Sequence, residues 1–226
     1  MLFVSTDLTN PTALRLLTTA ERLFAEESID GVSNRRISAE AGQRNNSALQ
    51  YHFENRDTLL EAILEYRQSP INQRRLGLLA DLQRRGLQGD VRALVEAMVL
   101  PYVELLSGPP AASYYMSLVS QLYSQQRLQL LFPAGRERTR SLFQVTALVR
   151  RVLGAMPNEE AQQRLELLGM TLNHSVARWA HERRAQPEAW PPARVQRQAG
   201  ILVAFMVGGL QEPREPAGNW LLALEN

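Results

Sequence analysis

The chain has 226 residues, of which 45% are apolar, so it can bury the core of one large domain or of a small and a larger domain. It contains no cysteine, which excludes disulfides and thiolate zinc sites, and its formal net charge of +2 is too small to indicate nucleic-acid binding by itself. The opening MLFVSTDLTNPT lacks the charged start of a signal peptide, and no later run approaches the roughly 20 apolar residues of a membrane span. We therefore expect a soluble, cytoplasmic protein with no membrane contact.

Helical periodicity dominates the chain, with no alternating strand pattern and no internal repeat. The first predicted helix covers 11–27 and begins with Pro11, which suits the first turn because proline lacks the amide hydrogen that the turn leaves unused. One side of this helix is apolar, as expected for a helix packed on a core. Its apolar residues are Ala13, Leu16, Leu17, Ala20, Leu23 and Phe24.

Three further helices are predicted by their caps and turns. Ser33 is a natural N-cap for a second helix that ends near Ala41, where Gly42 can take the left-handed conformation. Asn45 or Asn46 caps a short third helix. A fourth follows the cap Asn55, with Asp57 favourable in its first turn. This helix extends past Tyr66, and we expect Pro70 to kink or restart it because proline cannot donate the usual backbone hydrogen bond.

The rest of the chain is predicted to be helical, with breaks at glycine and proline clusters. The predicted helices cover 91–106, 113–125, 135–155, 159–185 and 192–210. We divide the chain into a compact three-helix unit, 1–55, and a larger helical domain, 56–226. The predicted fold class is all-α.

The short third helix has one apolar and one polar side. Leu49 and Phe53, four residues apart, face Ile37 and Phe24, while Asn46, Ser47, Gln50 and Tyr51 share the opposite side. Two helices joined by a tight glycine turn, the second exposing amides and a hydroxyl, are typical of a unit that enters the DNA major groove. Asn and Gln match the donor and acceptor of adenine, and Tyr, His and Arg bind phosphates. The predicted DNA contacts are Ser33, Arg35, Arg44, Asn46, Ser47, Gln50, Tyr51, His52 and Arg56.

The segment around this helix resembles the N-terminal helix-turn-helix of the tetracycline-repressor (TetR) family of bacterial transcription regulators. The resemblance covers about 14–66, and the turn AGQRN is one residue longer than the usual spacing. The features that carry it are Leu23-Phe24-Ala25, Ser33 with Ile37, Ala41-Gly42, Tyr51-His52-Phe53 and Leu59-Leu60. It implies a regulator, typically a repressor, that binds a palindromic DNA operator as a homodimer.

The resemblance also implies that the last two helices pair with those of a second subunit. Two apolar stripes are candidates for this surface, although the same stripes would also suit burial within one subunit. The first is Leu165, Leu168, Leu172, Val176 and Trp179 or Ala180, and the second is Ile201, Ala204, Phe205 and Gly208.

An effector site between the middle helices is a further implication of the resemblance. Aromatic residues and methionines with a few polar groups suit a small apolar or amphipathic ligand. The candidates are Tyr102, Tyr115, Met116, Tyr123, Phe143, Met170, Asn173 and His174. His174 and His181 are seven residues apart, too far along a helix for the usual pair of metal ligands, so we predict neither a metal nor a cofactor.

Two other functions stay open. One is a DNA-binding regulator without a small-molecule effector. The other is a helical-bundle enzyme, against which stand the absence of cysteine and of a glycine-rich phosphate loop, and the scatter of the three histidines.

Overall fold

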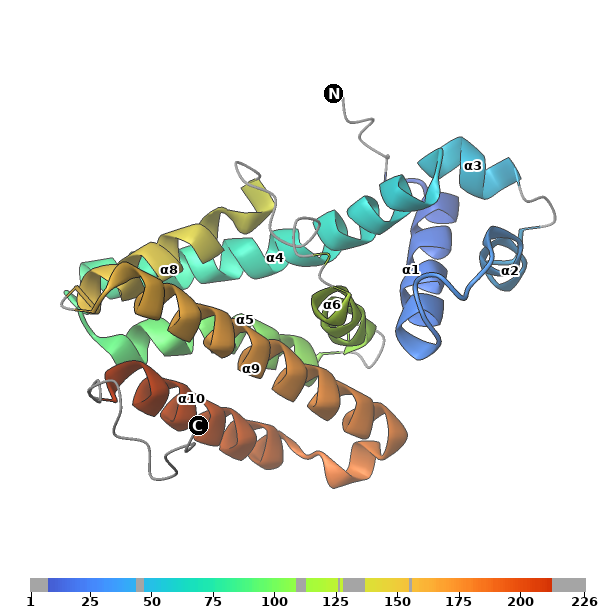
Figure 1. Cartoon of the computed structure of the whole chain (residues 1–226). Helices are drawn as coiled ribbons and strands as arrows, with labels where there is room; N and C mark the ends of the chain where they lie inside the picture. Colours follow the sequence, from blue (N-terminus) through green and yellow to red (C-terminus); the bar gives the residue numbers. More distant parts are fainter. Residues whose placement is uncertain are drawn as a thin grey trace, which may run out of the picture.

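The computed structural model describes residues 8–43, 47–108, 113–125, 127, 137–154 and 156–212. Within these ranges every regular element is a helix, which confirms the all-α prediction. The N-terminal helices α1, α2 and α3 form a small unit at one end, and the long helix α4 runs from this unit into the larger helical domain (Figure 1). None of the described helices combines the length and the apolar character that crossing a bilayer requires.

The N-terminal unit has the helices that its caps predict. These are α1 (Pro11–Glu26), α2 (Asn34–Glu40) and α3 (Ser47–Phe53). Ser33 caps α2, since its Oγ accepts a hydrogen bond of 3.2 Å from the amide of Arg36. The choice between Asn45 and Asn46 as the cap of α3 falls outside the described residues. The core of the unit consists of Leu16, Leu17, Leu23, Phe24, Ile37, Leu49, Phe53, Leu59 and Leu60, all buried.

The turn after α2 depends on the left-handed conformation of Gly42, whose φ is +74°. The amide of Gly42 donates to the carbonyl of Ala39 at 3.0 Å and that of Gln43 to the carbonyl of Ser38 at 2.9 Å. These two bonds form a Schellman motif, which satisfies carbonyls that the helix end leaves unpaired. The turn aims the chain from α2 toward α3, as the sequence predicts.

Replacing Gly42 by alanine is expected to lower the melting temperature by about 2–6 °C, because a side chain in this conformation costs about 1–2 kcal/mol. No heavy atom lies within 4 Å of the added methyl group, so backbone strain is the only cost. Gly77→Ala is the matched control: Gly77 lies inside a helix, is also uncrowded, and should gain stability on substitution. Equal melting temperatures for Gly42→Ala and the unmodified protein would contradict the prediction.

Helix α4 (Arg56–Arg84) is a single helix of 29 residues that continues through Pro70, so the proline does not restart it. Asn55 caps it as predicted, with its Oδ1 2.9 Å from the amide of Thr58. Helix α4 starts directly after the predicted domain boundary at Asn55, and it packs against α1 and α3 as well as against α5 and α8. The boundary itself stays a prediction.

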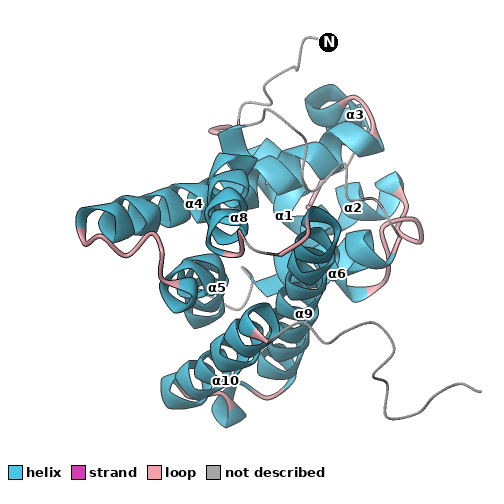
Figure 2. Ribbon diagram, turned by 60° about the vertical axis from the view of Figure 1, so that its left-hand side comes forward, coloured by secondary structure: helices cyan, strands magenta, loops and turns pink. Residues whose placement is uncertain are grey.

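The larger domain is a layered bundle, seen from a second side in Figure 2. Its helices are α5 (Val91–Ser107), α6 (Tyr114–Ser124), α8 (Arg140–Val152), α9 (Asn158–Ala185) and α10 (Pro192–Gln211), with short 3-10 turns η2 (Glu137–Thr139) and η3 (Pro187–Ala189). Helix α10 packs on α5, α8 on α4 and α5, and α6 on both α1 and α9. The helix predicted over 135–155 is shorter in the structure, because α8 starts only at Arg140, after the 3-10 turn η2.

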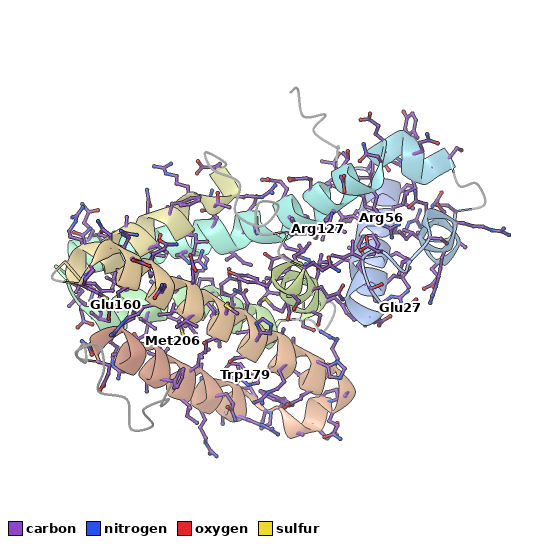
Figure 3. The ribbon with its side chains drawn as sticks, in the orientation of Figure 1. Glu27, Arg56, Arg127, Glu160, Trp179 and Met206 are labelled. Atoms are coloured by element: carbon purple, nitrogen blue, oxygen red, sulfur yellow. The ribbon has the colours of Figure 1, made fainter. Side chains whose placement is uncertain are left out.

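The apolar stripe predicted on 165–180 is largely internal. Leu168, Leu172, Val176, Trp179 and Ala180 are buried within the chain itself. Trp179 lies between α9 and α10 (Figure 3), and its ring is 6.3 Å from that of Trp190. This stripe could either pair with a second subunit or be buried within one subunit. The structure supports burial within one subunit.

Candidate functional site

Helix α3 presents its polar side to solvent. Leu49 and Phe53 are buried, whereas Gln50 is exposed and Tyr51 keeps 84% of its surface accessible. His52 is half-buried, and its ring meets that of Tyr51 edge-on at 5.1 Å. Gln50 and Tyr51 are therefore both available to contact a partner. The polar side thus has the orientation that a recognition helix requires.

The cations on the neighbouring helix α2 differ in how freely they face solvent. Arg36 pairs with Glu27 at 2.6 Å and with Glu40 at 2.9 Å. Hydrogen bonds from Arg22 and Arg36 lower the pKa of the Glu40 carboxyl, so this network stays ionised. Arg35 is exposed and makes no ion pair among the described residues. Arg35 is therefore the better placed of the two α2 arginines to contact a phosphate.

Arg56 faces the interior of the unit. Its guanidinium donates a hydrogen bond to the carbonyl of Val32 and lies over the ring of Phe24, 5.0 Å from the centroid. Figure 3 shows it at the start of α4, beside α1. In this position Arg56 holds the loop before α2 against α1 and is not directed at solvent. Ser33 is exposed at the start of α2 and Ser47 at the start of α3, while Arg44 and Asn46 lie outside the described residues.

In the larger domain, three of the predicted effector residues form a tyrosine cluster. Tyr115 is fully buried and Tyr102 nearly so, while Tyr123 is partly buried. Burial, and then the neighbouring Tyr102, raise the pKa of both Tyr115 and Tyr123. The phenols therefore stay protonated and uncharged at any physiological pH.

The other five predicted effector residues divide between the interior and the surface. Met116 is buried, and Asn173 donates a 2.7 Å hydrogen bond to the carbonyl of Gly169, a residue that adjoins the hydroxyl of Tyr123. The remaining three, Phe143, Met170 and His174, are exposed. The structure therefore brings together the tyrosines and Asn173, and it separates them from these three.

Two surface grooves lie elsewhere. One, of about 470 Å³, runs between α4 and α8, and the other, of about 280 Å³, lies near His181 and Trp190. The first is lined by Leu76, Leu79, Ala80, Gln83, Gln88, Arg140, Gln144, Ala147, Leu148 and Arg151. None of the eight predicted effector residues lines either groove. The first groove was not predicted from the sequence, although four of its residues recur at helical spacing: Arg140, Gln144, Ala147 and Arg151.

The sequence analysis also missed four buried polar side chains beside the tyrosines. Gln68, Asn72 and Arg75 project from α4 at intervals of four and three residues, and Ser141 lies at the start of α8. The sequence does contain a signal for them, because polar residues recur along the inner, otherwise apolar side of α4. Within the described ranges, no group of three or more His, Asp or Glu side chains is arranged to hold a metal ion.

The N-terminal unit of α1, α2 and α3 and the larger domain are joined through α4 and α6. The side chain of Gln121 on α6 donates to the carbonyl of Phe24 at 2.7 Å and accepts from the amide of Ile29 at 3.3 Å. Arg67 on α4 holds Glu21 on α1 through hydrogen bonds of 2.7 and 2.8 Å. Polar side chains of both α4 and α6 therefore hold α1.

Comparison with known proteins agrees with this architecture. Residues 16–63 match the family model "Bacterial regulatory proteins, tetR family", and residues 96–209 match that of the tetracyclin repressor-like C-terminal domain. A tetR family transcription regulator from Shewanella sp. PV-4 has a similar fold, with a TM-score of 0.59 and 16% identity over 88% of this chain and 97% of that one. A transcriptional regulator from Rhodococcus sp. Rha1 aligns with a TM-score of 0.49 and 23% identity over 87% and 96% of the two chains. No curated protein sequence matches the chain.

The two family models cover both the helix-turn-helix and most of the larger domain, in the order in which the structure has them. This membership also excludes the helical-bundle enzyme. The chain belongs to the tetR family of bacterial regulatory proteins and is a DNA-binding transcription regulator.

Proposed function

We propose that α3 is the recognition helix and reads base edges in the major groove of an operator. The observation that carries this proposal is the exposed polar side of α3, with Gln50 and Tyr51 accessible beside buried Leu49 and Phe53. Gln50, Ser47 and Asn46 face the bases, whereas Tyr51, His52, Ser33, Arg35 and Arg44 bind phosphates. Arg56 supports the unit from within.

The protein acts as a homodimer in this proposal. Four large apolar side chains on α9 and α10 are exposed: Leu167, Met170, Ile201 and Phe205, each between 48% and 68% accessible. Ala204 and Gly208, also exposed on α10, leave room for the close approach of a second helix. Exposed apolar side chains on two packed helices are typical of an interface, and a two-fold dimer would present two recognition helices to a palindrome.

We further propose that the protein is a cytoplasmic repressor released by a small apolar or amphipathic ligand. The tyrosine cluster adjoins the helices that contact α1, so a ligand bound there would bias their arrangement. Such a ligand must prefer the arrangement that does not fit DNA, since equal affinity for both states shifts nothing. The burial of Tyr102, Tyr115 and Met116 also suits a regulator without an effector, in which these residues are core.

The DNA proposal is tested by selecting bound sequences from random duplexes with the purified protein at moderate salt. We expect a palindrome to be enriched, with affinity that falls steeply as salt rises. Gln50→Ala and Tyr51→Ala should each weaken operator binding by about tenfold or more, because both half-sites lose a contact. Gln73→Ala, an exposed glutamine on α4, is the control and should leave binding unchanged. If no sequence is enriched even at low salt, the recognition-helix assignment is wrong.

A further inference from the structure

Arg75 is a buried cation in the middle of the larger domain, with 3% of its surface accessible. Its guanidinium donates to the carbonyls of Ala97 and Met98 on α5, both at 3.3 Å, and to the hydroxyl of Ser141 at 3.2 Å. Pro101, inside α5, explains the first of these acceptors, since proline has no amide hydrogen for the carbonyl four residues earlier. All three acceptors are neutral, and all three bonds are longer than those usual between charged partners.

The charge of Arg75 has no carboxylate beside it in the described part of the chain. Arg138, equally buried, provides the contrast, since its Nη1 lies 2.9 Å from Glu61 and 3.0 Å from Glu65. A guanidinium does not lose its proton in a protein, and buried charges are normally paired because removing them from water is costly. The site around Arg75 therefore favours the binding of an anion.

Two other groups next to Arg75 also favour an anion. Ser141 belongs to the first turn of α8, a helix of 13 residues whose N-terminal end carries partial positive charge. Asn72 accepts a 2.8 Å hydrogen bond from the amide of Ser141, while its Nδ2 is buried and donates to no group among the described residues. Asn72 and Arg75 thus both hydrogen-bond to Ser141. An anion there would accept hydrogen bonds from both side chains.

The neighbouring side chains are aromatic. The ring of Tyr102 lies 5.4 Å from the guanidinium carbon of Arg75, and the fully buried Tyr115 is next to Tyr102. One planar guanidinium with otherwise neutral donors matches a single carboxylate, whereas a dianionic phosphate would leave buried negative charge uncompensated. Tyrosine rings beside the guanidinium suit a ligand with a flat apolar body.

We propose that the effector is a monocarboxylate with a flat apolar body, bound through its carboxylate by Arg75 and Asn72 at the N-terminal end of α8. This inference rests on the proposed function, because it names the chemistry of the ligand for that effector site. Since Arg75, Asn72 and Ser141 are buried against one another, the carboxylate enters only when α8 moves away from α4. Helix α4 begins in the DNA-facing unit, so this movement links ligand binding to DNA release.

The test uses the full-length protein with 3-phenylpropanoate and its uncharged counterpart 3-phenylpropanamide as probes, at constant pH and ionic strength. We expect the carboxylate at saturation to raise the melting temperature by about 5 °C and the amide to raise it by much less. Equal shifts with the two probes, or no shift with either, would overturn the proposal.

Three variants locate the effect. Arg75→Met should abolish the response to the carboxylate, whereas Arg140→Met, in the groove between α4 and α8, should keep it. Asn72→Asp keeps the acceptor for Ser141 and adds an internal carboxylate beside Arg75, so it should raise the melting temperature and remove the response to the probe. Asn72→Asp therefore tests the proposed carboxylate site even if Arg75→Met does not fold. A lower melting temperature for Asn72→Asp, or a response that depends on Arg140, would contradict the assignment.

Operator binding, measured separately, distinguishes this inference from the proposed function. Release of the selected operator by 3-phenylpropanoate, lost in Asn72→Asp, supports both. An operator that is bound but indifferent to the carboxylate leaves the DNA assignment standing and overturns the effector chemistry. Failure to enrich any operator overturns the DNA assignment alone, provided that the carboxylate still stabilises the protein through Arg75.

Discussion

Replacing Phe205 by glutamate is expected to convert the proposed dimer to a monomer and to weaken binding to the proposed palindromic operator by about a hundredfold or more. Phe205 is 68% exposed on α10, one turn from Ile201, which is 60% exposed. In the proposed dimer, the two-fold axis brings two copies of this face together, so the substitution buries two unpaired carboxylates. Dimerisation matters for DNA binding because it makes the second half-site contact intramolecular.

The measurement is sedimentation equilibrium, followed by operator titration at one salt concentration. Phe143→Glu is the matched control, because Phe143 is 46% exposed on α8, away from the α9 and α10 face. This variant should remain dimeric and keep its affinity for the operator. A Phe205→Glu protein that stays dimeric would show that the interface lies elsewhere.

Removing Arg67 is expected to cause the largest loss of stability, about 3–5 kcal/mol, because it leaves the Glu21 carboxylate buried without its partner. Glu21 on α1 is 1% exposed, and burial raises its pKa even though hydrogen bonds from Arg67 oppose the shift. Chemical denaturation of Arg67→Met at neutral pH measures the loss. The double variant Glu21→Met/Arg67→Met should recover most of it, since two apolar side chains of similar size bring no unpaired charge.

The pH dependence of Arg67→Met provides a second check. With Arg67 absent, the folded state binds the proton on Glu21 more tightly than the unfolded state does, because burial raises the folded pKa above the ordinary value of 4.5. The deficit in stability is then largest above the folded pKa and shrinks as the pH falls through it. A deficit that does not change between neutral and mildly acidic pH, or a double variant as unstable as Arg67→Met, would contradict this account.

The helix-turn-helix could be predicted from the sequence because its signals are local. The cap at Ser33, the turn at Gly42 and the spacing of Leu49 and Phe53 each involve residues within a few positions of one another. These signals also oriented α3, so Gln50 and Tyr51 were correctly expected on the exposed side. Which bases they contact stays a prediction, because base contacts depend on how the whole unit docks.

The tyrosine cluster of the larger domain could be predicted only as a region of the chain. Residue type predicts Tyr102, Tyr115 and Tyr123, which the structure gathers. It equally predicts Phe143, Met170 and His174, which lie on the surface. Residue type indicates suitability for a pocket. The direction of each side chain depends on which helix packs against which.

By itself the sequence determined the all-α class, the caps at Ser33 and Asn55, the glycine turn and the exposed side of α3, because backbone hydrogen bonding and side-chain periodicity decide these features over a few residues. Only the tertiary structure decided that the stripe on α9 packs inward while Ile201 and Phe205 stay exposed, that Arg56 packs on Phe24, and that Arg75 lies buried without a carboxylate. These outcomes depend on contacts between helices far apart in the chain, and the pattern of one helix does not specify its neighbours.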